Sequence, residues 1–175
     1  LWAAGEPRGS QYMNVNWIGP AIFSSGSAEQ KEEHLKRIAT GDVTWCQGFS
    51  EPGAGTDLAA LNTSAVRDGD DYIINGEKIW TSYAQVAEFC FILARTDPDS
   101  VGTKGISIFL VPTTTPGYRA EVIPSVLDIH EYNRLTFTDM RVPSSCRLGE
   151  ENEGWDVIRR ALAHERIGGP RYARA

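Results

Sequence analysis

Residues 63–81 read TSAVRDGDDYIINGEKIWT, three short runs of alternating apolar and polar residues divided by Asp68-Gly69 and Asn75-Gly76. Alternation with a period of two is typical of a strand that buries one face. An Asn-Gly pair between such runs favours a type I′ hairpin, because that turn needs a positive φ at both central residues. We therefore predict three strands joined by tight turns, at residues 63–67, 71–74 and 77–81.

Four further runs of the same kind follow, and glycine, proline or small polar residues separate them. A succession of short strands with such turns is typical of an antiparallel β sandwich or barrel. We predict that the middle of the chain is a β domain of this kind, with its later strands at residues 89–95, 106–111, 119–123 and 134–138.

A helix is predicted directly before the β domain. Ser27 can cap its N-terminus, Gln30 falls at the reciprocal capping-box position, and Gly41 follows its last residue. Upstream of this helix no long element is expected, because the chain is interrupted by Gly5, Pro7, Gly9, Gly19 and Pro20.

A second helix is predicted after the β domain. Gly154 precedes the run WDVIRRALAHERIGG, in which Trp155, Ile158 and Leu162 recur at the spacing of one helical face. The predicted fold class is therefore α+β. We place the boundaries at residues 1–42 for the first helical part, 43–148 for the β domain and 149–175 for the second helical part.

The composition excludes several classes of function. The chain has 175 residues, 41% of them hydrophobic, and a net charge of −6 without a cluster of lysine or arginine. Such a chain can bury a core but offers no basic surface to nucleic acid or to an anionic membrane. Its longest apolar run, residues 89–94, is far too short to span a membrane.

Three cysteines, Cys46, Cys90 and Cys146, are widely spaced, form no CxxC pair and have no histidine at ligand spacing. This pattern predicts neither a disulfide framework nor a metal site, and it favours a reducing compartment. The sequence begins at Leu1 and stops at Ala175 within a helical pattern, so we expect a fragment of a longer protein.

Residues 46–57 read CQGFSEPGAGTD, a segment too irregular for a regular element. Its glycines would let the backbone approach a bulky group such as a phosphate. The segment lacks a GxGxxG between a strand and a helix, and it lacks the GK[ST] of a P-loop, so it fits neither nucleotide-binding motif. The alternative is a connecting loop whose glycines only satisfy turn geometry.

Five ordered segments resemble those of the acyl-CoA dehydrogenase family, and the resemblance extends over nearly the whole chain, more weakly before about residue 17. They are GPAIFSSGSAEQKEEHLKRIATGD at 19–42, WCQGFSEPGAGTD at 45–57, NGEKIWTSYAQVAEF at 75–89, KGISIFLVP at 104–112, and TFTDMRVP with LGEENEGW between 136 and 155. The resemblance implies a flavin-binding β domain between the end of an N-terminal helical domain and the first helix of a C-terminal bundle, both truncated here.

The resemblance implies FAD as the cofactor. Trp80 would pack beside the flavin ring and Ser82 would donate near its N5/O4 edge, although Trp80 could instead be a core aromatic at a strand end. Family members often carry an aromatic residue where Gln47 stands, which is a mild departure. The residues implied to hold FAD are Gln47, Phe49, Ser50, Gly55, Thr56, Trp80, Thr81 and Ser82.

Glu165 is the candidate catalytic base. It continues the apolar face of the last predicted helix, where a carboxylate is unexpected, and no basic residue lies three or four positions away. The alternative is a glutamate that is solvated or paired with a distant arginine. In the family the base occupies either the place of Glu165 or one farther along the C-terminal bundle, and His164, Arg166 and Thr56 fall where the family contacts acyl-CoA.

The resemblance implies oxidation of a saturated acyl-CoA to its trans-2-enoyl thioester, as in fatty acid β-oxidation. A carboxylate would take the α-proton while the β-hydrogen leaves as hydride to the flavin. Electrons would pass to an electron-transfer flavoprotein or a similar acceptor. It also implies a homotetramer, built as a dimer of dimers, in a bacterial cytoplasm or, in a eukaryote, the mitochondrial matrix.

Two rival functions stay open at this point. An acyl-CoA oxidase or a flavin monooxygenase of the same superfamily would keep the fold and react with oxygen. A non-catalytic FAD-binding subunit of a heteromeric dehydrogenase would stabilise its partner without turning over.

Overall fold

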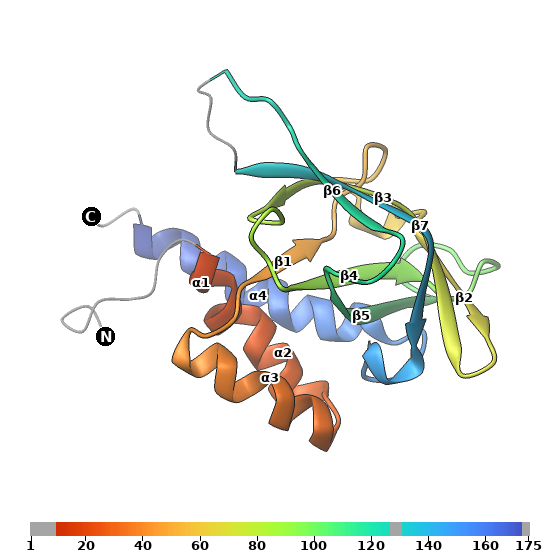
Figure 1. Ribbon diagram of the computed structural model, residues 1–175, viewed down its shortest axis with the longest axis horizontal. Coiled ribbons are helices and arrows are strands. Elements are labelled where there is room, and N and C mark those ends of the chain that lie inside the picture. The colour runs from red at the N-terminus through yellow and green to blue at the C-terminus, as the bar shows by residue number, and fades with distance from the viewer. Residues whose placement is uncertain (1–9, 127–130, 173–175) are drawn as a thin grey trace.

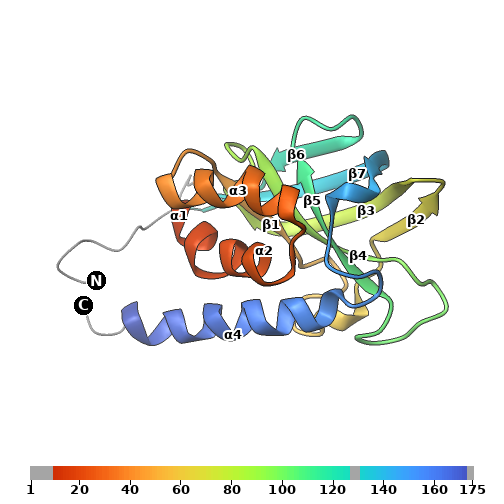
Figure 2. The same cartoon turned by 90° about the horizontal axis from the view of Figure 1, so that it is seen from below.

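The computed structural model describes residues 10–126 and 131–172, and of residues 164–172 it describes the backbone only. Helices α1 to α4 gather on one side of a curved, eight-stranded sheet (Figures 1 and 2). The α+β class and the central β domain are confirmed.

The first helical part is more continuous than predicted. Helix α1 (Ser10–Met13), a π-helical stretch (Asn14–Ile18) and α2 (Gly19–Ser25) follow one another without a break. The expectation that Gly19 and Pro20 interrupt the chain is therefore wrong. The N–H of Gly19 donates to the carbonyl of Asn14 in the wide π turn, and Pro20 falls in the first turn of α2, where a missing N–H is tolerated.

Helix α3 (Ala28–Thr40) begins and ends as predicted. Its capping box is complete, because Gln30 N donates to Ser27 Oγ over 3.2 Å and Ser27 N donates to Gln30 Oε1 over 3.1 Å. Gly41 adopts a φ of 77°, and its N–H donates to carbonyls of the last turn. The Gln30 amide also donates to the carbonyl of Arg147 over 3.0 Å, which fixes α3 to the sheet.

The sheet has the strand order β6-β7-β3-β2-β4-β5-β8, and β1 pairs with β4 outside this path. Most neighbouring strands pair antiparallel, as predicted. The pairing of β1 with β4 and the single paired position between β2 and β4 are parallel, which the sequence did not predict. The strands are β1 (Trp45–Gly48), β2 (Ser64–Asp68), β3 (Asp71–Ser82), β4 (Phe89–Arg95), β5 (Ile106–Pro112), β6 (Tyr118–Val122), β7 (Tyr132–Pro143) and β8 (Arg147–Leu148).

The predicted turn at Asn75-Gly76 is also wrong. Strand β3 runs through both residues, and its register with β7 shifts between Ile74 and Gly76. Gly76 has a φ of 149°, and a Cβ atom there would lie 2.5 Å from Thr63 Oγ1, so glycine is required by a close approach inside a β bulge. The Asn75 side chain bonds Asp139 of β7. The other predicted turn, at Asp68-Gly69, is the β2–β3 hairpin.

Two apolar cores lie on the two faces of the sheet. One fills the space between the sheet and the helices, and the other lies against the opposite face of the sheet. Strand β4 serves both, since Phe91 and Leu93 belong to the first core while Cys90 and Ile92 belong to the second. Helix α4 (Gly154–Tyr172) is confirmed and closes the first core with Ile158 and Ala161, among other residues.

Candidate functional site

The glycine-rich segment leaves the end of β1 and lies beside the end of β3. Glu51 and Ala54 exchange two backbone hydrogen bonds, of 2.9 and 3.1 Å, and so form a tight turn. The N–H of Ile79 donates to the carbonyl of Ser50 over 2.8 Å. This bond joins the two segments that the resemblance assigned to the flavin, residues 46–57 and 75–89.

The segment carries backbone donors that the protein itself does not use. Within the described residues, the N–H groups of Ser50, Gly55 and Thr56 make no hydrogen bond. A Cβ atom added at Gly53 or Gly55 would meet no heavy atom within 4 Å, and neither glycine has a positive φ. Turn geometry therefore does not require glycine at these two positions, whereas close approach of an anionic or planar ligand would favour it.

Trp80 stands out from the end of β3. Its φ is +62°, a left-handed conformation that is strained for a bulky residue, and its side chain is 59% exposed. The register between β3 and β7 shifts between Lys78 and Thr81, and the Trp80 ring meets Tyr132 edge to face at 6.4 Å. Within this chain Trp80 is therefore not a core aromatic, and its ring is available to a ligand.

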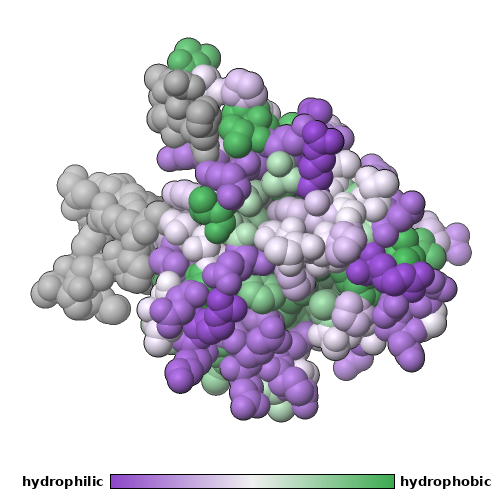
Figure 3. Space-filling view, viewed as in Figure 1, coloured by the Kyte–Doolittle hydropathy of each residue, from purple (hydrophilic) through white to green (hydrophobic). Residues whose placement is uncertain are grey.

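Exposed apolar residues surround this end of the sheet. In Figure 3 small groups of green, apolar side chains lie near the end of β6, among purple and white ones. Large apolar side chains that lie close together and stay exposed are typical of a binding surface. The residues concerned are Trp80, Val86, Val122 and Tyr132, which are between 40% and 60% exposed.

Two of the remaining predicted residues face inward. Phe49 is buried against Phe91, so only its backbone can face a ligand. Thr81 is buried, and its Oγ1 atom has no partner among the described residues. Such an orphaned hydroxyl beside the exposed Trp80 fits a site that a ligand or a water completes.

The last two residues predicted to hold FAD, Gln47 and Ser82, are half-buried. Gln47 accepts a hydrogen bond from Trp17, and Ser82 lies at the very end of β3.

A buried ion pair at this site was missed by sequence analysis. Lys78 Nζ lies 2.9 Å from Glu51 Oε1, and Lys78 has no exposed surface. The sequence did contain a sign that Lys78 is buried. When the alternation of Tyr72 and Ile74 is continued along β3, Lys78 falls on the same, buried face of the strand. The turn predicted at Asn75-Gly76 restarted that alternation and hid it.

The two charges shift each other's titration. Burial by itself raises the pKa of Glu51, but Lys78 and the hydrogen bonds from Thr63 and Asn62 together hold this pKa below its usual value. Burial lowers the pKa of Lys78, and Glu51 offsets only part of that effect.

The residues predicted to contact acyl-CoA are only partly described. Thr56 is exposed on the glycine-rich segment. His164, Glu165 and Arg166 belong to the backbone of α4, and their side chains lie outside the described part of the structure.

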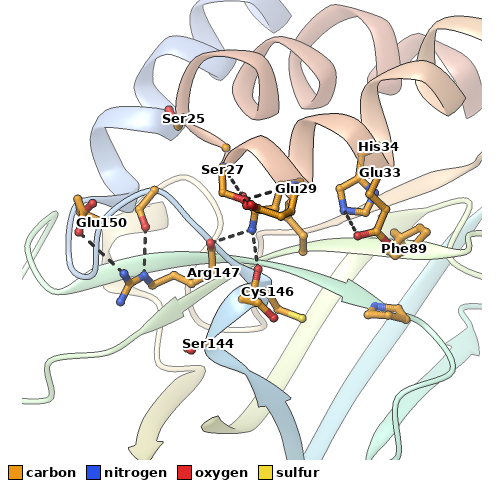
Figure 4. Close-up of a pocket in the computed structure, with 16 residues that line it drawn as sticks. Ser25, Ser27, Glu29, Glu33, His34, Phe89, Ser144, Cys146, Arg147 and Glu150 are labelled. Carbon is orange, nitrogen blue, oxygen red and sulfur yellow. Dashed lines mark hydrogen bonds and ion pairs between the residues drawn. The ribbon is translucent and has the colours of Figure 1, made fainter. Parts of the chain in front are cut away.

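A cavity of about 780 Å³ lies elsewhere, between α3 and the strands β5 and β8 (Figure 4). His34 and Glu33 line it from α3, while Cys146 and Arg147 line it from the sheet side. None of the residues predicted to hold FAD belongs to it.

The described residues contain no cluster of acidic, histidine and cysteine side chains suited to a metal. No helix among them combines the length and the apolar character that a membrane crossing needs.

Unused backbone donors on the glycine-rich segment, together with an exposed aromatic ring at the adjoining end of β3, suit a planar ligand that carries acceptor groups. Residues 46–140 match the acyl-CoA dehydrogenase middle domain. The chain belongs to the acyl-CoA dehydrogenase family, as the resemblance implied, and this family is FAD-dependent.

The relatives agree with this assignment. The chain is 45% identical to the acyl-CoA dehydrogenase FadE26 of Mycobacterium tuberculosis, over 94% of this chain and 41% of that protein. The structure of the Tcur3481-Tcur3483 steroid ACAD aligns with a TM-score of 0.86 and 44% identity, over 90% of this chain and 41% of that one. A glutaryl-CoA dehydrogenase from Mycobacterium smegmatis in complex with FADH2 aligns with a TM-score of 0.78 and 35% identity, over 89% and 39%. The chain thus spans about two fifths of the length of these relatives.

Proposed function

We propose that this chain is the FAD-binding part of an enzyme that removes the α- and β-hydrogens of an acyl-CoA thioester. The observation that carries the proposal is Trp80, exposed and left-handed, next to Ile79, whose N–H bonds the segment that holds the unused donors of Ser50, Gly55 and Thr56. A bulky side chain held in a strained, solvent-facing position is typical of a functional site.

FAD, when bound, accepts the hydride of the β-hydrogen. The chain's own residues bind and orient it, with Gln47, the backbone at Phe49 and Ser50, and the end of β3 around Trp80, Thr81 and Ser82. Gly55 and Thr56 offer donors to phosphate oxygens. We assign these roles within a β domain of residues 43–148, between helical parts of residues 1–42 and 149–175.

The base is proposed to be Glu165, on the last helix of the chain. A carboxylate in a closed site has its pKa raised toward neutrality and can take an α-proton that the thioester has made acidic. His164 and Arg166, its neighbours on the helix, would contact the acyl-CoA together with Thr56.

The acyl group is proposed to be bulky. The relative with a TM-score of 0.86 is named as a steroid ACAD, so a steroid-type acyl-CoA is the first substrate to test. Glutaryl-CoA is the natural comparison, because a glutaryl-CoA dehydrogenase shares the fold at lower identity.

The test uses the full-length protein that contains this chain. It should purify yellow, with bound FAD, and its flavin should bleach under anaerobic conditions when the right acyl-CoA is added. Glu165→Gln should retain FAD and lose the bleaching by a factor of about 10² or more. A colourless protein that cannot be reconstituted with FAD would refute the proposal.

A second candidate is a subunit of a two-component enzyme, favoured by the steroid ACAD whose name joins two components. In that case an assembly with a second chain replaces the homotetramer, and the partner carries the base. Unchanged turnover of the intact assembly after Glu165→Gln would favour this candidate. Electrons would pass to an electron-transfer flavoprotein or similar acceptor in either case, and rapid reaction of the reduced flavin with oxygen would instead favour an oxidase.

A further inference from the structure

The buried pair of Lys78 and Glu51 is bonded on every side. Lys78 Nζ donates to Glu51 Oε1 over 2.9 Å and to the carbonyl of Phe49 over 3.1 Å. Glu51 Oε1 also accepts from the N–H of Thr63 at 2.9 Å, and Oε2 accepts from the N–H of Asn62 at 2.7 Å. The carboxylate is 7% exposed and the ammonium is fully buried.

These bonds fix both segments of the proposed FAD site. Glu51 precedes the loop of residues 52–61, and Asn62 and Thr63 follow it. The Glu51 carboxylate therefore joins the two ends of the loop that carries Gly55 and Thr56. Lys78 lies on β3 two residues before Trp80. A single ion pair therefore sets the loop and the exposed indole relative to each other.

Stability alone does not account for such a pair. Taking two charges out of water offsets most of their attraction, and apolar side chains of similar volume are often as stable or more so. What an apolar pair would not supply is a cation at the Phe49 carbonyl. That carbonyl belongs to the same peptide group as the N–H of Ser50, which has no partner among the described residues.

We propose that Lys78 and Glu51 are positioning residues for the flavin: they hold the glycine-rich loop in place and polarise the Phe49–Ser50 peptide, so that the Ser50 N–H is a strong donor to an acceptor atom of the cofactor. A cation bonded to an amide oxygen strengthens donation by the amide N–H. Reduced flavin carries more negative charge than oxidised flavin, so a stronger donor favours the reduced form. The inference rests on the proposed function.

The experiment compares wild-type holoenzyme with the double variant Lys78→Met/Glu51→Leu in the full-length protein. Urea unfolding of the apoprotein checks that the variant folds. Two further readouts are the dissociation constant of FAD and the reduction potential of the bound flavin. We expect a variant that folds but is less stable than wild type, because the N–H groups of Asn62 and Thr63 and the carbonyl of Phe49 lose their partners. We also expect a dissociation constant raised about tenfold or more and a lower reduction potential.

Arg141→Met is the matched control. Arg141 is paired with Asp71 over 3.0 Å and with Asp68, but these pairs lie at the surface of the same sheet. The control should change neither flavin readout. A folded double variant with unchanged affinity and potential would overturn the inference.

If the double variant does not fold, the variant Glu51→Gln tests the inference in its place. It keeps the shape of the side chain and removes the negative charge that Lys78 Nζ bonds. Both flavin readouts should therefore shift in the same direction as in the double variant, and unchanged readouts would overturn the inference. A wild-type protein that takes up no FAD would refute the proposed function itself, whereas a wild type that binds FAD like its variants refutes only the role of the pair.

Discussion

The indole N–H of Trp17 donates to Oε1 of Gln47 over 2.6 Å, and this bond joins the first helical part to strand β1. Trp17 lies in the π-helical stretch and is 6% exposed. Because an indole nitrogen can only donate, the bond fixes the orientation of the Gln47 amide and leaves its Nε2 atom as a donor. The helical part therefore sets the polarity of a side chain beside the proposed flavin site.

Trp17→Phe should destabilise the chain by about 1–2 kcal/mol, since Oε1 of Gln47 loses its donor in a half-buried place. Urea unfolding of the 175-residue chain measures the change. Phe23→Leu is the control, because Phe23 is 70% exposed and its truncation should stay within about 0.5 kcal/mol. Equal effects of the two variants would show that the bond has no net role.

Gly76→Ala should be severely destabilising, by about 3 kcal/mol or more, because its Cβ would lie 2.5 Å from Thr63 Oγ1 and 2.7 Å from Thr63 Cα. Gly69→Ala is the matched control. Gly69 also has a positive φ, of 64°, but no atom lies within 4 Å of an added Cβ, so only the backbone strain of about 1 kcal/mol remains. A Gly76 variant no worse than the control would contradict the close approach inside the bulge.

The sequence predicts most elements of this fold because periodicity and capping are local properties. The limits of β4 and the capping box of Ser27 and Gln30 follow directly from residues a few positions apart. The bulge at Asn75-Gly76 could not be predicted in this way. Its cause is the approach of Thr63 and a side-chain bond to Asp139, and both partners are distant in sequence.

The candidate site, too, could be predicted from the sequence only in part. The positions of Ser50, Gly55 and Trp80 follow from motifs that are continuous in sequence. The pairing of Lys78 with Glu51 depends on how β3 lies against the loop, which local patterns do not specify. The parallel pairing of β1 with β4 was missed for the same reason, since a four-residue strand next to an irregular loop has too little periodicity to be recognised.

His34 should make stability depend on pH. It is buried between the rings of Trp45 and Phe89, at 5.1 and 5.0 Å, and burial lowers its pKa below 6.5, while Glu33 opposes and Arg37 adds to the shift. The unfolded chain then binds the proton more readily, so stability is full above about pH 6.5 and falls as the pH drops toward the lowered pKa.

The slope for one such group is at most about 1.4 kcal/mol per pH unit. His34→Gln should lose this part of the pH dependence between about pH 7 and pH 5, even if the variant is less stable throughout. Urea unfolding of both proteins at several pH values measures it. Parallel curves for the two proteins would show that His34 does not titrate differently on folding.

The 175-residue chain by itself should bind FAD more weakly than about 1 μM. Ligand sites enclose most of the surface of their ligand, whereas Trp80, Val86 and Tyr132 are open on one side among the described residues. Titration of the chain with FAD, followed by flavin fluorescence, measures the affinity, and the full-length protein is the control. Sub-micromolar binding by the chain alone would show that the β domain needs no further cover.

Two substitutions of Trp80 should separate its backbone strain from its role in cofactor binding. Its φ of +62° is strained for tryptophan and for alanine but not for glycine. Trp80→Gly should therefore be more stable than Trp80→Ala by about 1 kcal/mol in the apoprotein, although glycine is the more flexible residue when unfolded. Both variants remove the exposed ring, so both should weaken FAD binding in the full-length protein to a similar extent.

Thermal unfolding and FAD titration measure the two effects separately. If Trp80→Gly were the less stable variant, the left-handed conformation would not be the source of strain, and if both retained wild-type affinity, the indole would have no part in holding the flavin.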